Sequence, residues 1–186
     1  TPAGASLSVI GNYVGLNTIG AVIGELGVGI KIESSGLDGS GIVIGGVNAD
    51  EGNVIAGVTF DGFAFGIQLA ETIGVQVFGN KIGTNPSGAV SAGYGNAIGI
   101  AIVSGSGPGN NKIGGVNPGE GNIIASSSTA GVFVLNVMGA YSTRNAILGN
   151  SILANNLVGI DHVEFDGMSL VGQGANINDA GDADAG

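Results

Sequence analysis

The amino-acid sequence predicts an all-β fold: a right-handed, single-stranded parallel β-helix of about five turns, with three short strands in each turn. Two observations lead to this prediction. A Gly-Asn dipeptide recurs at alternating long and short intervals, and short runs of Val and Ile follow recurring glycines between its copies. Self-similarity with a period of tens of residues is typical of solenoids, in which each repeat packs on its neighbours along the chain.

The composition fits one domain with an uncommon sequence. The chain has 186 residues, of which 39 are Gly and four are Pro, and it lacks the Gly-X-Y period of collagen. The recurring Val and Ile runs exclude a disordered glycine-rich linker, because such a linker lacks apolar surface to bury. The chain has no Cys, so disulfides and thiolate metal sites are excluded as well.

The charge excludes two classes of partner. The net charge is −10, and only four residues are Lys or Arg. Nucleic acids and anionic lipids bind basic surfaces, so we expect neither a nucleic-acid partner nor attachment to anionic membranes. No apolar run approaches the roughly 18 residues of a membrane-spanning helix, so we expect no membrane insertion.

The strand that follows each Gly-Asn dipeptide is the most regular. A branched aliphatic residue lies two positions after each Asn, and the intervals between successive asparagines are 41, 27, 42 and 28 residues. Adjoining long and short intervals together span 68 to 70 residues, so two turns form one unit. The asparagines are Asn12, Asn53, Asn80, Asn122 and Asn150, and the aliphatic residues are Val14, Ile55, Ile82, Ile124 and Ile152.

A second kind of strand begins at a Gly followed by an aliphatic residue. Alternation with a period of two then continues, which indicates a strand with one buried face. The aliphatic residues expected to face inward are Ile30, Ile67, Ile100, Val132 and Ile160, and the next residues, expected on the outer face, are Lys31, Gln68, Ala101, Phe133 and Asp161.

A third, more variable strand completes each turn, over residues 42–44, 75–77, 112–113 and 146–148. Asn-Gly and Asp-Gly pairs, which build tight hairpins, are rare here, so the strands do not read as a chain of hairpins. We therefore expect equivalent strands to stack in parallel from turn to turn. Repeating parallel crossovers of this kind favour the right-handed coil.

The five asparagines are predicted to form a ladder inside the coil. Each Asn shares the face of the inward aliphatic residue two positions later, so it is expected at a corner, turned inward. Stacked about 4.8 Å apart, the side-chain amides can bond one another, and a buried polar group without partners would cost about 1–3 kcal/mol. This structural role outweighs a ligand-binding one for these residues.

The long intervals contain matching inserts. Residues 44–56 and 113–125 share the pattern Ile-Gly-Gly-Val-Asn followed by Glu-Gly-Asn, and this pattern places Glu51 and Glu120 at equivalent positions. They lie two turns apart, at about 10 Å in an ideal stack. They form the best candidate pair for glycoside hydrolysis, which needs two carboxyl groups about 5–10 Å apart. The alternative is that each carboxylate caps its own loop or faces solvent.

The regular pattern decays after Asp161. We predict a β-helix over residues 1–163 and an acidic tail, or a segment that covers the edge of the coil, over residues 164–186. Asp179, Asp182 and Asp184 have oxygen-rich spacing that would suit Ca²⁺, although the fixed loop of an EF-hand is absent. A solvated tail without metal is the other interpretation. The sequence indicates no other cofactor.

Four segments carry a resemblance to known proteins: the two Ile-Gly-Gly…Gly-Asn segments, residues 79–85 and residues 150–161. They resemble the right-handed parallel β-helix repeats of large secreted and surface-anchored bacterial proteins. Residues 178–186 are similar to the acidic exit of that family, whereas His162 stands where the family usually has an inward aliphatic residue. The resemblance implies an extracellular or cell-surface location. It leaves the activity open, because the same coil serves adhesins, tailspikes and polysaccharide-degrading enzymes.

The predicted function is therefore a non-catalytic structural or adhesive module that contacts a polysaccharide or a cell-surface partner. The alternative is a carbohydrate-active enzyme, a polysaccharide lyase or glycoside hydrolase, that uses Glu51 and Glu120. The lone His162 is expected to be a rim residue rather than a ligand. The open ends of a solenoid need covering, so we expect neighbouring domains or self-association there.

Overall fold

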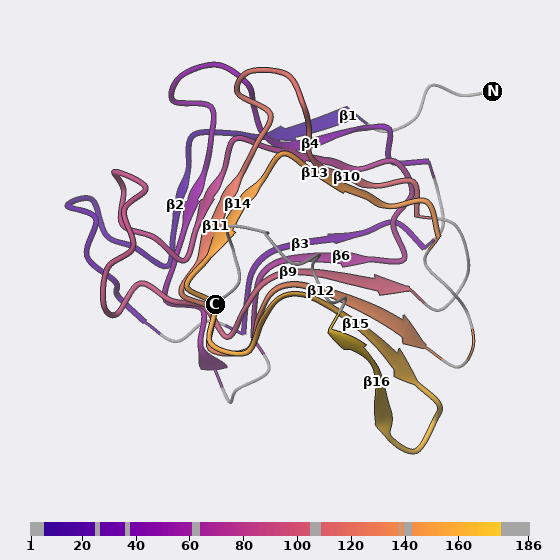
Figure 1. The fold of residues 1–186 in the computed structure, drawn as a ribbon. Coiled ribbons are helices and arrows are strands. Elements are labelled where there is room, and N and C mark those ends of the chain that lie inside the picture. Colours follow the sequence, from indigo (N-terminus) through magenta and orange to yellow (C-terminus); the bar gives the residue numbers. More distant parts are fainter. Residues whose placement is uncertain are drawn as a thin grey trace.

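The computed structural model describes residues 6–24, 27–35, 38–60, 64–104, 109–137, 139 and 143–175, and it places sixteen β-strands in three sheets. Figure 1 shows the sheets as three sides around a common interior. The first sheet contains β1 (Ser6–Val9), β4 (Gly41–Gly45), β7 (Gln76–Phe78), β10 (Lys112–Gly114) and β13 (Ala146–Leu148). The second contains β2 (Tyr13–Val14), β5 (Val54–Ile55), β8 (Lys81–Ile82), β11 (Ile123–Ala125) and β14 (Ser151–Leu153).

The third sheet contains the longest strands. They are β3 (Val28–Glu33), β6 (Phe65–Ala70), β9 (Ile98–Ser104), β12 (Ala130–Val137), β15 (Val158–Phe165) and β16 (Leu170–Ala175). In every sheet, neighbouring strands up to β15 are three apart in sequence order and parallel, for example β1 with β4 and β3 with β6. The structure therefore confirms the predicted parallel β-helix of five turns with three strands in each.

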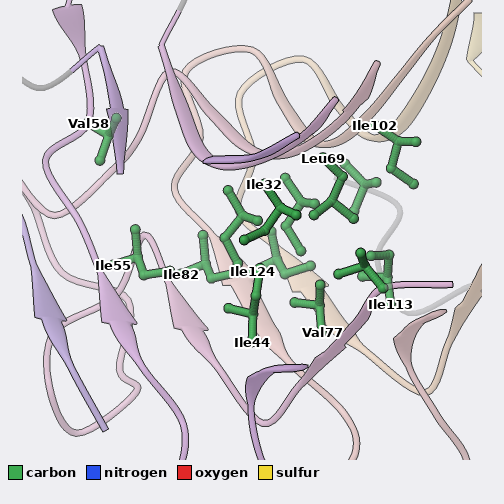
Figure 2. Close-up of a cluster of buried hydrophobic side chains, with 14 of the residues drawn as sticks. Ile32, Ile44, Ile55, Val58, Leu69, Val77, Ile82, Ile102, Ile113 and Ile124 are labelled. Atoms are coloured by element: carbon green, nitrogen blue, oxygen red, sulfur yellow. The ribbon is translucent and has the colours of Figure 1, made fainter. Parts of the chain in front are cut away.

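The interior is filled by aliphatic columns in the predicted register. Ile100 aligns with Ile67 on one side and Val132 on the other, and Ile124 aligns with Ile82 and Ile152. These side chains belong to one buried cluster that draws on all three sheets. Figure 2 shows part of it, with Ile82 and Ile124 of the second sheet near Ile44 of the first. Burial of apolar surface at roughly 25 cal/mol per Å² makes this cluster the main stabilising element.

Glycines allow the third sheet to approach the second. The backbone at Gly66, Gly99 and Gly131 lies so close to the next turn that no side chain fits. A Cβ atom on Gly99 would lie 2.5 Å from the carbonyl oxygen of Gly131 and 2.7 Å from Cγ2 of Ile124. The requirement at these positions is therefore one of space, since their backbone angles are open to other residues.

The asparagine ladder is continuous through all five turns. The Oδ1 atom of each later Asn accepts hydrogen bonds from both the backbone N–H and the side-chain amide of the Asn one turn earlier. Asn122 Oδ1 accepts from Asn80 N at 2.9 Å and Asn80 Nδ2 at 3.0 Å. The same pair of bonds links Asn12 to Asn53, Asn53 to Asn80, and Asn122 to Asn150. Each Nδ2 from the second turn onward also donates to a carbonyl of the preceding turn, at Val9, Ile44, Val77 and Ile113.

The other two corners of the coil also use asparagine, which the sequence patterns did not reveal. Between the third and first sheets, Asn145 Oδ1 accepts from the backbone and the side chain of Asn111. Between the second and third sheets, Asn96 Oδ1 accepts from Val58 N, and Asn155 Oδ1 accepts from Ser127 N. The spacing at these corners varies with loop length, so no fixed interval marks them.

Two strands lie outside the predicted pattern. Strand β1 has mostly exposed side chains, so its sequence gives little signal. Strand β16 pairs antiparallel with β15, with Leu170 opposite Phe165. It therefore lies along the edge of the last turn of the third sheet, within the segment predicted as a tail or an edge cover. The boundary proposed between residues 163 and 164 stays a prediction.

Replacement of a central ladder residue should destabilise the fold. Asn53→Ala or Asn122→Ala leaves backbone and side-chain amides of the neighbouring turn unpaired in a buried site, so we expect a loss of about 1–3 kcal/mol in the free energy of unfolding, measured by denaturant titration. Asn156→Ala is the control, because Asn156 is exposed and its side chain donates to the carbonyl of Ser128 at the surface, with no bond to another asparagine. Equal losses in the variants and the control would contradict a structural ladder.

A methyl group at the glycine column should be destabilising for a different reason. Gly99→Ala places a Cβ atom against Gly131 and Ile124, and overpacking of this kind costs about 1–3 kcal/mol or more. Gly24→Ala is the matched control, because a Cβ atom there has no heavy atom within 4 Å. Thermal unfolding followed by circular dichroism measures both variants. An unchanged melting temperature for Gly99→Ala would show that the turns can move apart.

Candidate functional site

The two predicted glutamates each bond within their own loop. Glu51 accepts hydrogen bonds from Asn48, at 2.8 Å from Nδ2 to Oε1 and 3.1 Å from the backbone N to Oε2. Glu120 accepts the equivalent bonds from Asn117, at 3.0 Å and 3.2 Å. The glycines at the start of the loops, Gly46 and Gly115, leave the space that each carboxylate occupies. These contacts match the loop-capping alternative.

The two glutamates differ in one electrostatic interaction, the ion pair that Glu120 makes with Lys112. Hydrogen bonds from the side chain and backbone of Asn48 lower the pKa of Glu51. The corresponding bonds from Asn117 lower the pKa of Glu120, with a smaller contribution from Lys112. The Lys112 ammonium lies 3.2 Å from Glu120 Oε2 and 4.9 Å from the centre of the Phe78 ring. Glu120 is only 9% exposed. Lys112, its partner in the ion pair, lies against the ring of Phe78 in the third turn.

The loops over residues 46–52 and 115–121 contact each other across the short third turn. A Cβ atom on Gly119 would overlap the carbonyl of Val47, and one on Gly79 would overlap the carbonyl of Gly46. Close stacking of the loops therefore depends on a turn without an insert between them. No hydrogen bond or ion pair among the described residues joins Glu51 to Glu120. Their role as a catalytic pair stays a hypothesis.

A groove of about 560 Å³ crosses several turns on the outside of this corner. Its floor consists of the glycines that precede the ladder asparagines, Gly11, Gly52, Gly79 and Gly121, together with Tyr13, Val54 and Lys81, which begin three successive strands of the second sheet. The loop over residues 46–50 forms one wall, and Pro86 stands on the other side. The recurring Gly-Asn dipeptides marked this strip of glycines in the sequence, but no sequence pattern indicated that the loop over residues 46–50 and Pro86 enclose a groove over it.

Two further loops cover the outer face of the second sheet. They begin at Asn17 and Asn85, whose Oδ1 atoms accept backbone N–H bonds from Ala21 and Ala89, four residues ahead in each case. Both share the sequence Gly-X-Asn-X-X-Gly-Ala-Val, at residues 15–22 and 83–90. The two loops extend away from the coil beside β2 in Figure 1.

These two loops bury outward apolar residues of the second sheet. The Tyr94 hydroxyl donates to the carbonyl of Gly20 at 2.9 Å, which ties the loops together. Val54 is packed with Leu16 and Tyr94, and a Cβ atom on Gly88 would lie 3.1 Å from Cδ1 of Ile123. The two loops therefore cover apolar side chains that would otherwise face water. The shared loop sequence was visible in the chain and could have predicted the pair.

Of the remaining predicted site residues, His162 lies in the described part of the chain and is not among the residues that line the groove. His162 aligns with Val134 in the last turn, is exposed, and contacts the side chain of Asn136 through Nε2. Asp179, Asp182 and Asp184 lie outside the described residues, so the Ca²⁺ interpretation stays a prediction. Within the part that the structure describes, no group of three His, Cys, Asp or Glu side chains is arranged to hold a metal ion.

These features define the class of the protein as a parallel β-helix with asparagine-lined corners. Comparison with family models, with curated proteins and with solved structures found no match for this chain. Among the described residues, no helix is long and apolar enough to cross a membrane.

The lowered pKa of Glu120 predicts a dependence of stability on pH. A carboxyl group whose pKa is lower in the folded state than its ordinary value of 4.5 stabilises the fold above that value, and its contribution is lost as the pH falls toward the folded-state pKa. We expect the free energy of unfolding to fall over this acid range by less in Glu120→Gln than in the unmodified protein. Urea titrations at neutral and acid pH measure the difference. Identical pH profiles would show that Glu120 is not held by Asn117 and Lys112.

Proposed function

We propose that this chain is a non-catalytic, rigid β-helical module of a secreted or cell-surface protein, which acts as a stalk or adhesive element by presenting its outer face to a partner. The observation that carries the proposal is the unbroken asparagine ladder from Asn12 to Asn150. Amides that bond from turn to turn, buried at Asn53, Asn80 and Asn122, hold the turns at fixed spacing. A surface built on such a frame suits binding to an extended partner. Neighbouring domains or further copies would cover the ends of the coil.

The state of the two glutamates supports binding over catalysis. A general acid in glycoside hydrolysis needs a raised pKa, so that it carries a proton near neutral pH. Hydrogen bonds lower the pKa of both Glu51 and Glu120. The oxygens of each carboxylate also bond to a neighbouring Asn in the same loop. Neither residue is poised to give a proton to a leaving group.

An activity assay tests this proposal. The purified chain is incubated with neutral and with uronic-acid polysaccharides, and new reducing ends and unsaturated products are measured. We expect no product above the level of a heat-denatured sample. Product formation that disappears in Glu120→Gln would overturn the non-catalytic function and would favour the enzyme alternative. Glu51→Gln serves as the comparison, because Glu51 has the same loop contacts without a lysine partner.

A further inference from the structure

The groove across the corner of the first and second sheets has a floor that is unusual in being made largely of backbone. Gly52, Gly79 and Gly121 lie so close to neighbouring turns that a Cβ atom on any of them would overlap a carbonyl group. Side chains are therefore absent for structural reasons along this strip. Glycine also lets a ligand approach the main chain closely. The strip passes through four turns, so at about 4.8 Å per turn it is roughly 14 Å long.

The side chains along the groove suit an uncharged, hydroxyl-rich ligand. Tyr13 is 50% exposed at one end and offers an aromatic face with a hydroxyl group. Asn48 uses its Nδ2 to hold Glu51, and its exposed side chain lines the wall. Sites for small ligands typically combine an aromatic surface with a few fixed polar groups that set the orientation.

The charges in and around the groove argue against an acidic ligand. The groove has one cation, Lys81, whose ammonium group donates to the carbonyl of Pro86 at 2.8 Å, and one acid, Asp50. These two charges balance within the lining, but the carboxylate of Glu51 lies next to it, between Asp50 and Gly52, and the chain as a whole carries −10. An acidic polymer would approach through a repulsive field, whereas a neutral one would not be opposed.

We propose that this groove binds a neutral glycan chain that lies along the axis of the coil, with a sugar ring against the face of Tyr13. The inference rests on the proposed function, in which the outer face of the module binds a partner. The glycine strip forms a floor without side chains under the glycan. The loop over residues 46–50 borders one side of this floor, and Pro86 borders the other. The length of the strip sets the preference for a short oligosaccharide over a single sugar.

Titration calorimetry with neutral hexose oligosaccharides of increasing length tests the groove. We expect measurable binding that strengthens from monosaccharide to short oligosaccharide, and at least a tenfold loss of affinity in Tyr13→Ala. Tyr13→Phe should retain most of the affinity, because it keeps the aromatic face. Phe60→Ala is the matched control, since Phe60 is an aromatic residue 56% exposed and outside the groove lining. Thermal melts confirm that each variant is folded.

Three results would overturn the proposal: no binding of any neutral oligosaccharide, equal affinity for Tyr13→Ala and the unmodified chain, or tighter binding of uronic-acid oligosaccharides of the same length. These failures can be told apart from failure of the proposed function. Catalytic turnover in the assay above would reject a non-catalytic module even if Tyr13 were needed for binding. Glycan binding that is unchanged in Tyr13→Ala would reject the groove as the binding site, but it would still support a binding module.

Discussion

The fold depends on one requirement, that an asparagine amide buried at a corner finds its hydrogen-bond partners in the neighbouring turns. Each central ladder asparagine receives two bonds from the turn before it, and it donates two to the turn after it. No single turn can satisfy these groups alone, so the turns are stable only as a stack. The same rule operates at the two other corners, through Asn111, Asn145, Asn96 and Asn155. The hydrogen bonds between asparagine amides thus fix the register of the turns, while burial of the aliphatic columns supplies most of the free energy that stabilises the fold.

This arrangement explains a sequence that is rich in glycine and poor in charge. Close stacking of the turns excludes side chains at Gly66, Gly99 and Gly131, and the inward columns are mainly aliphatic, with asparagine amides at the corners. The outer face keeps some apolar residues as well, because the loops that start at Asn17 and Asn85 fold over Val54 and Ile123. We therefore propose that function is placed on the loops and on the grooves between them.

Much of the fold could be predicted from the sequence, because Gly-Asn and Gly-Ile recur at intervals that only a stacked coil explains. The five-turn topology, the two main aliphatic columns and the ladder all follow from those intervals. The groove was not predicted, although Tyr13 and Lys81 both follow a Gly-Asn dipeptide, because the loops that border it, with Asp50 and Pro86, follow no repeat that marks them as neighbours. The hydrogen bond from the Tyr94 hydroxyl to the Gly20 carbonyl joins residues 74 positions apart, and no sequence pattern indicates it. Strand β16 was missed because it is antiparallel and is not part of the repeat.

The stacking of the two long loops across the short third turn has a consequence for how such a chain can change in length. Gly119 reaches Val47 only because the turn between them carries no insert. Removal or gain of a single turn would bring two inserted turns, or two uninserted ones, into direct succession. Duplication of the whole two-turn unit preserves the alternation and continues the column of amides. Gene lineages of this architecture are therefore expected to grow and shrink in steps of about 69 residues, as the intervals of 68 to 70 residues indicate.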